Sequence, residues 1–216
     1  MRHHRPTAAA VALAAVCALA GCSGSSDSGP VAKISTPPSS STHGAIVFDT
    51  PFPKPALDLT DQDGKRYDLV RRTAGRPLLL YFGYTHCPDV CPTTMADLAG
   101  AVQRLPTGSP RPTVVFVTTD PQRDTPGRLK QWLREFDPHF VGLTGDFGTI
   151  QRAARGLGIG VSAPVRNADG SESVTHGAEV VVFSPKDDKA HLLYPSGTPE
   201  SRFAADLPRL VQGATP

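Results

Sequence analysis

Cys87 and Cys91 are the residues of this chain with the clearest chemical potential, and three residues separate them. They follow a continuous apolar run at 78–82, which is typical of a strand buried on both faces, as in a parallel sheet. Pro92 suits the first turn of a helix, and the next apolar residues have helical spacing: Met95, Leu98, Val102 and Leu105. Residues four apart face each other across one helical turn, so the sequence predicts two neighbouring sulfurs at a strand–helix junction.

The helix that follows this pair is expected to influence the chemistry of its sulfurs. The positive end of a helix stabilises a thiolate and lowers the pKa of a thiol. Such thiolates are soft ligands that favour Cu(I), and an added imidazole can serve both Cu(I) and Cu(II). The same groups would serve a thiol–disulfide reductase, but thioredoxin-type oxidoreductases have two intervening residues where this chain has three. A peroxidase, a zinc site and a structural disulfide are more remote alternatives.

Three further residues are candidates for the same site. His176 lies on a predicted loop just before the strand at 179–183, so it can approach the cysteines from a neighbouring strand end, although a surface histidine is the simplest interpretation from the residues alone. His86 is adjacent to Cys87 and should point away from it, which favours a structural role, or contact with a metal ligand, over direct binding of the metal. Asp89 lies between the cysteines and could bond His176, bind Cu(II) or remain a solvated turn carboxylate.

Other residues with suitable side chains receive structural interpretations. Met95 belongs to the apolar stripe of its helix and is expected in the core. His139 and His191 are expected on the surface. Asp120 and Asp124 stand before a predicted helix, where they should shape the turn and cap the helix, with partner docking as the weaker alternative.

The first 44 residues have the composition of a targeting segment and a tether. Arg2 and Arg5 precede an apolar run, and residues 19–22 form a lipobox, so residues 1–21 are expected to be a lipoprotein signal peptide cleaved before a lipidated Cys22. Residues 22–44 are rich in Ser and Pro and predict a flexible tether with a reach of about 25 Å. The folded domain is then 45–216, at the extracytoplasmic face of the cell membrane.

The charge of the chain gives no reason to expect nucleic-acid binding. It has 22 basic and 20 acidic residues, a net charge of +2, which falls to zero once Arg2 and Arg5 leave with the signal peptide. Cleavage would also remove Cys17, so Cys87 and Cys91 would be the only thiols left in an oxidising compartment. Such a pair should either form a disulfide or bind metal.

Apolar patterning in the remaining chain predicts an α/β fold. Asp63-Gly64 joins two short strands as an N-terminal β-hairpin. Alternation of strands and helices, an antiparallel hairpin and a final helix together predict a central mixed sheet with helices on both faces. The predicted strands lie at 56–60, 65–69, 78–82, 113–117, 140–143, 179–183 and 190–194, and the apolar stripes of the predicted helices lie at 95–105, 129–136, 147–157 and 203–210. Residues 167–173 should form a hairpin tip, Gly158 should end the third helix, and Pro208 should kink or shorten the last one.

Several motifs resemble the Sco/SenC proteins from about residue 56 to the last helix. They are Phe82-Gly83-Tyr84-Thr85-His86-Cys87-Pro88-Asp89-Val90-Cys91-Pro92-Thr93-Thr94, Asp120-Pro121, Asp124-Thr125-Pro126, Phe136-Asp137-Pro138 and Gly142-Leu143-Thr144-Gly145. The resemblance implies a thioredoxin-like fold and copper ligands at Cys87, Cys91 and His176. The histidine motif departs from the family pattern, because Thr175-His176-Gly177-Ala178 stands where the family more often has Asp-His-Ser-Ala.

The same resemblance implies a function and partners. Sco/SenC proteins are membrane-anchored metallochaperones that help to assemble the dinuclear copper centre of cytochrome c oxidase. We therefore expect copper as the cofactor, as Cu(I) and also Cu(II), subunit II of the oxidase as a partner, and another protein as the copper donor. The enzymatic alternative, an extracytoplasmic reductase using Cys87 and Cys91 on a metalloprotein target, stays open.

Overall fold

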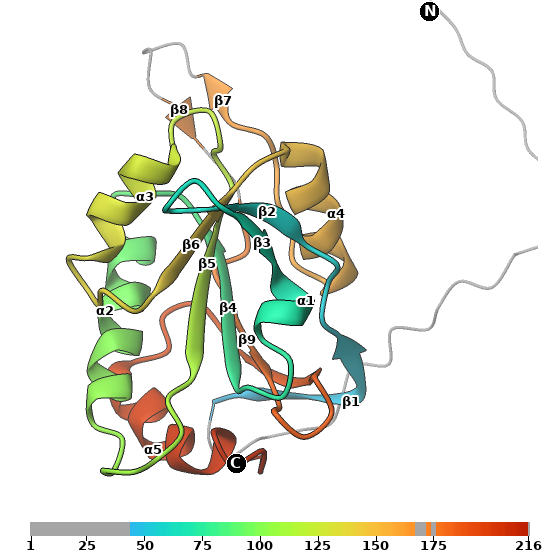
Figure 1. The fold of residues 1–216 in the computed structure, drawn as a ribbon, viewed down its shortest axis with the longest axis vertical. Coiled ribbons are helices and arrows are strands. Elements are labelled where there is room, and N and C mark those ends of the chain that lie inside the picture. The colour runs from blue at the N-terminus through green and yellow to red at the C-terminus, as the bar shows by residue number, and fades with distance from the viewer. Residues whose placement is uncertain (1–43, 167–171, 174–175, 216) are drawn as a thin grey trace, which may run out of the picture. The chain divides into compact units, whose positions relative to one another are not determined.

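The structure is a computed structural model that describes residues 44–166, 172–173 and 176–215. Its main feature is an eight-stranded sheet in the order β1-β10-β9-β4-β5-β6-β2-β3 (Figure 1). These strands are β1 (Ile46–Pro53), β2 (Asp58–Asp61), β3 (Arg66–Asp68), β4 (Leu78–Gly83), β5 (Thr113–Thr118), β6 (Val141–Thr144), β9 (Val180–Phe183) and β10 (Lys189–Tyr194). A separate two-stranded hairpin pairs β7 (Val165–Arg166) with β8 (Glu172–Ser173).

The centre of the sheet is parallel and its flanks are antiparallel. Strands β4, β5 and β6 run in the same direction, whereas β9 pairs with β4 in the opposite direction. All six residues of β4 are buried, as the continuous apolar run predicts for a strand covered on both faces. The mixed α/β sheet expected from the sequence is therefore confirmed.

Helices cover both faces of this sheet and complete two apolar cores. The helices are α1 (Leu69–Arg72), α2 (Val90–Gln103), α3 (Pro126–Leu133), α4 (Phe147–Gly156) and α5 (Glu200–Leu210). Leu79 and Tyr81 of β4 belong to the core that also includes residues of α2, α3 and α5. Leu80 and Phe82, which alternate with them, belong to the opposite core with residues of α1 and α4. Side chains of a strand point alternately to its two faces, so β4 links both layers.

Some predicted element boundaries differ from the structure. Two elements, β1 and α1, have no predicted counterpart. Strand β1 is a mostly exposed edge strand and α1 is a single turn, so the apolar residues of both show little periodicity. Helix α3 ends before Phe136, which still packs its ring against Trp132 with centroids 4.9 Å apart. Helix α5 continues past Pro208 to Leu210, so the proline lies only two residues from its end.

Several local signals of the sequence are confirmed. Gly64 adopts a φ of 75° in the β2–β3 turn, and Gly158 adopts a φ of 77° just after α4. These are left-handed conformations that favour glycine. The tip expected at 167–173 is only partly described, and the pairing of β7 with β8 agrees with a hairpin there.

The predicted signal peptide, the lipidated Cys22 and the tether to residue 43 lie outside the described residues. Within the part of the chain that is described, no helix combines the length and the hydrophobicity needed to cross a bilayer.

Candidate metal centre

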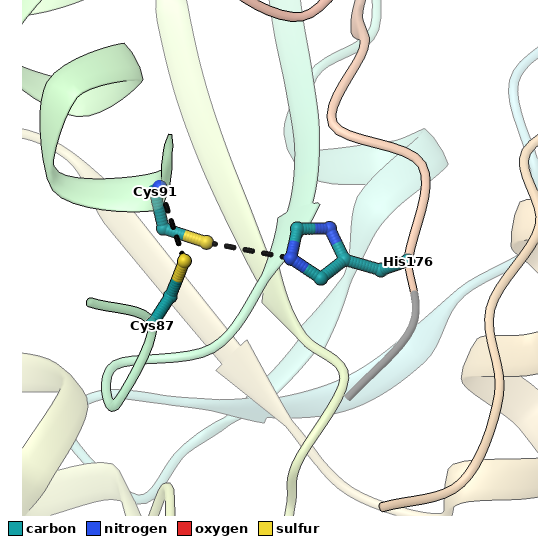
Figure 2. A group of neighbouring side chains, drawn as sticks. All are labelled: Cys87, Cys91 and His176. Atoms are coloured by element: carbon teal, nitrogen blue, oxygen red, sulfur yellow. Dashed lines mark hydrogen bonds between the residues drawn. The ribbon is translucent and has the colours of Figure 1, made fainter. Parts of the chain in front are cut away.

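The two cysteines occupy the junction between β4 and α2. Cys87 lies in the connecting loop, where its N–H donates to the Tyr84 carbonyl at 3.2 Å. Cys91 lies in the first turn of α2, and its N–H points at the Cys87 sulfur at 3.4 Å (Figure 2). Both thiols are free, and Cys91 is fully buried whereas Cys87 is partly exposed. The strand–helix junction thus places two sulfurs side by side without a disulfide.

His176 reaches the same place from the far end of the chain. Because β9 runs antiparallel to β4, with Val180 opposite Tyr81, the segment before β9 lies beside the end of β4. A β-bridge between His176 and Val161, with Gly177 N–H donating to Gly160 O at 2.7 Å, holds that segment. The imidazole Nε2 lies 3.6 Å from the Cys91 sulfur (Figure 2).

The three side chains form a compact set of candidate ligands. One ligand atom from each of Cys87, Cys91 and His176 lies within 4.8 Å of the others. Two sulfurs and one imidazole nitrogen are the donors that a soft, three-coordinate metal ion prefers. The arrangement can therefore hold one such ion between the loop, the helix and the strand end.

Hydrogen bonding orients the imidazole of His176 for ligation. Its Nδ1 lies 3.1 Å from the Gly177 carbonyl, which can only accept, so the ring proton of the neutral form is on Nδ1. Burial lowers the pKa of His176 below its ordinary value of 6.5, while the Gly177 bond opposes that change. The ring is therefore neutral near pH 7, with the Nε2 lone pair directed at Cys91.

The pKa of Cys91 corrects one expectation from the sequence. The helix N-terminus was expected to lower the thiol pKa, but burial raises the pKa of Cys91 to about 12, and a hydrogen bond from Tyr81 offsets only part of this. A buried thiolate has no water to stabilise its charge, and this effect on the pKa is larger than that of the helix N-terminus. Cys91 is consequently a protonated thiol at neutral pH until a cation displaces its proton.

Two tyrosines that the sequence interpretation missed line the site. Tyr81 is fully buried, and its hydroxyl donates to the Cys91 sulfur at 3.5 Å. The ring of Tyr84 meets the His176 ring edge-on, with centroids 5.5 Å apart. Alternation along β4 could have indicated Tyr81, since it shares a strand face with Leu79 toward α2. The contact between Tyr84 and His176 exists because β9 pairs with β4, so the residues around Tyr84 in the sequence do not predict it.

The remaining candidates lie around the site rather than in it. Asp89 is exposed at the start of α2 without a side-chain capping bond, and both ring nitrogens of His176 already face other groups. His86 turns toward Asp124, with Nδ1 3.5 Å from its carboxyl oxygen. Met95 is buried in the core as expected.

The two histidines expected on the surface lie near other carboxylates. His139 contacts Asp137 at 3.0 Å, and His191 contacts Asp187 at 2.9 Å. None of these four residues belongs to the Cys87, Cys91 and His176 cluster.

The acidic loop after β5 also differs from expectation. Thr125, not an aspartate, caps α3 by accepting a hydrogen bond from Arg128 N–H. Asp120 is buried and pairs with Arg123. Asp124 is fully buried and accepts hydrogen bonds from residues outside its own loop. A partner-docking role for these two carboxylates is not favoured, because neither is on the surface.

Comparison with known proteins places this geometry in context. The family model described as SCO1/SenC matches residues 50–212. A protein of Stutzerimonas stutzeri called "Putative copper-binding protein" is 35% identical over 132 residues, which are 61% of this chain and 64% of that protein. The mitochondrial "Protein SCO2 homolog" of Danio rerio is 34% identical over 60% of this chain and 46% of its own length. The matched regions thus span less than two thirds of these relatives.

Solved structures show the same fold over most of the described chain. Bradyrhizobium japonicum ScoI with copper bound is 32% identical, with a TM-score of 0.62, over 74% of this chain and 98% of that one. Apo Sco1 from Thermus thermophilus is 32% identical, with a TM-score of 0.66, over 77% and 95% of the two chains. The matched family model and these structures confirm the family and the thioredoxin-like fold that the sequence motifs imply.

Proposed function

Because the chain belongs to the SCO1/SenC family, we propose that it is a copper metallochaperone with Cys87, Cys91 and His176 as the metal ligands. The observation that carries this proposal is the convergence of two sulfurs and one imidazole nitrogen within 4.8 Å. Thiolates favour Cu(I), and the neutral imidazole serves either oxidation state of copper. The copper-bound structure of a relative at 32% identity supports copper as the cargo.

The unequal exposure of the ligands suits delivery of a metal ion. Cys91 is fully buried beneath Tyr81, whereas Cys87 is partly exposed on the loop. A ligand of a partner protein can therefore approach the ion from the side of Cys87, while Cys91 and His176 retain it. Copper binding displaces the proton of Cys91, so loading releases a proton and unloading takes it back.

Membrane anchoring and the recipient belong to the same proposal. The signal peptide at residues 1–21 would direct export and be cleaved, and the lipidated Cys22 with a tether to residue 44 would then hold the domain 45–216 at the extracytoplasmic face. The proposed recipient is the dinuclear copper centre in subunit II of cytochrome c oxidase, with a separate protein as copper donor. Replacing Cys22 by Ala should release the protein from the membrane fraction, and mass spectrometry of the mature N-terminus should show the lipid on the wild type.

A thiol–disulfide reductase remains the second candidate, because both cysteines are free and one is accessible. The position of His176 favours copper, since exchange of disulfides needs no imidazole nitrogen against the buried sulfur. The raised pKa of Cys91 also leaves that sulfur a poor nucleophile at neutral pH.

An anaerobic Cu(I) titration against a chelator of known affinity, with zinc as a competing ion, tests the proposal. We expect one Cu(I) per chain, loss of binding in Cys87→Ser and Cys91→Ser, and weaker binding with an altered Cu(II) spectrum in His176→Ala. His139→Ala is the matched control, because its exposed ring pairs with Asp137 away from the cysteines. If the reduced wild type does not bind copper but reduces a model disulfide, the protein is a reductase and the chaperone proposal is wrong.

A further inference from the structure

The carboxyl group of Asp124 is fully buried and connects the loop after β4 with the end of β5. Its Oδ2 accepts the Thr85 N–H at 2.9 Å and the Thr118 hydroxyl at 2.6 Å. Its Oδ1 accepts the Thr85 hydroxyl at 2.6 Å. Three hydrogen bonds satisfy a polar group that would otherwise be costly to bury.

The residues in this cluster come from three different elements. Thr85 lies in the loop after β4, two residues before Cys87, and Thr118 is the last residue of β5. Arg128 of α3 donates from Nε to the Thr85 hydroxyl at 3.0 Å. The Thr85 side chain thus donates to Asp124 and accepts from Arg128, so its rotamer is held from two sides.

This anchoring matters because the other contacts of Cys87 are local to the loop and helix. The Cys87 N–H bonds the Tyr84 carbonyl, and the Cys87 sulfur faces the Cys91 N–H. Neither contact ties the loop to β5 or α3. Asp124 connects the backbone and side chain of Thr85 to Thr118 at the end of β5, and Arg128 adds a bond from α3 to the same threonine.

We propose that Asp124 is a positioning residue for the metal site, which holds the backbone before Cys87 so that its sulfur stays within reach of Cys91 and His176. This inference rests on the proposed copper function. The carboxyl group acts through Thr85 and does not touch the metal, and the cap of α3 is supplied by Thr125 instead. The buried aspartate therefore has its partners in the metal-binding loop and at the end of β5 rather than in the helix that follows it.

Substitutions at Thr85 test this role without removing a buried carboxyl group. Thr85→Val keeps the shape of the side chain but loses the hydroxyl, and Thr85→Ser restores it. Asp124→Asn is the direct variant, and Thr73→Val is the matched control, since Thr73 is a buried threonine that donates to Leu69 O at 2.7 Å. Measurements are Cu(I) affinity, the thiolate-to-Cu(II) absorption bands, thermal stability and, without metal, the rate of Cys87 alkylation.

We expect Thr85→Val and Asp124→Asn to weaken Cu(I) binding roughly tenfold, to shift the Cu(II) bands and to speed Cys87 alkylation by a similar factor. Thr85→Ser should behave like wild type, and Thr73→Val should lose only stability. Wild-type affinity, spectrum and alkylation rate in Thr85→Val would overturn the inference. If the wild type binds no copper, the chaperone proposal fails, and the metal-free alkylation rate alone then decides whether Asp124 holds the loop.

Discussion

The Nε2 atom of His176 lies 3.6 Å from the sulfur of Cys91, although 85 positions separate the two residues in the chain. The antiparallel pairing of β9 with β4 creates this contact, since it brings the segment before β9 to the end of β4. The Tyr81 hydroxyl reaches the same sulfur. The Cys91 sulfur is therefore central to the site, contacted by groups from β4 and from the His176 segment.

Removing the Tyr81 hydroxyl should weaken copper binding without abolishing it. Tyr81→Phe deletes a neutral donor, because burial raises the pKa of Tyr81 far above its ordinary value. A hydrogen bond to a thiolate contributes about 1.5–3 kcal/mol, so Cu(I) affinity should fall at least about tenfold, as measured by chelator competition. The Cu(II) charge-transfer bands should shift as the sulfur gains electron density.

Tyr194→Phe is the matched control for that change. Tyr194 is also buried, but its hydroxyl donates to Asp206 at 2.8 Å and not to a cysteine. It should lose stability by about 1 kcal/mol with unchanged copper affinity. Equal copper affinities for Tyr81→Phe and wild type would show that the Tyr81 contact does not influence the site.

Gly83 should not tolerate even a methyl group. A Cβ atom at this position would lie 2.9 Å from the Cys91 sulfur and 2.7 Å from Cε1 of Tyr81. Gly83→Ala should therefore displace the sulfur, lower copper affinity and cost about 1–3 kcal/mol of folding free energy, measured by denaturant unfolding. Gly127→Ala is the control, because a Cβ there meets open space. Similar losses in both variants would contradict this account.

The two thiols should react with alkylating agents at very different rates. Cys87 is partly exposed, whereas Cys91 is fully buried and burial raises its pKa to about 12. Since the thiolate is the reactive form, iodoacetamide should modify Cys87 first in the metal-free native protein at pH 7. Peptide mapping by mass spectrometry distinguishes the two positions. In denaturant the rates should become similar, and equal rates in the native state would refute the predicted difference in burial.

Acid should destabilise the metal-free domain partly through His176. Its pKa in the folded state is below the ordinary value of 6.5, because burial disfavours the charged ring. The unfolded state then binds the proton more readily, so the contribution of His176 to stability is present above pH 6.5 and is lost as pH falls through the lower folded pKa.

Unfolding free energies from pH 8 to pH 5 measure this effect against His176→Gln. The wild type should lose more stability over this range than the variant, which has no titrating ring at position 176. Carboxylates with lowered pKa, such as Asp58 and Asp146, titrate below 3.8 and are common to both proteins. Parallel curves for the two proteins would contradict the prediction.

Local patterns in the sequence predicted much of the fold. The apolar run at β4, the helical spacing after Cys91 and the Asp63-Gly64 turn each depend on residues only two to four positions apart. The weak elements β1 and α1 gave no comparable pattern, because one is an exposed edge strand and the other a single turn. The motif resemblance to Sco/SenC proteins supplied His176, for which its own neighbours carry no ligand signal.

The sequence by itself determined that two sulfurs meet at a strand–helix junction. The spacing of Cys87 and Cys91 brings their side chains together whatever the position of that helix in the fold. Only the tertiary structure decided what surrounds them. Strand order brings His176 to Cys91, and burial raises the Cys91 pKa against the helix field. The buried Asp124 carboxyl has its partners in the loop after β4 and at the end of β5. Contacts of this kind depend on which distant segments pack together, and short-range periodicity carries no information about that choice.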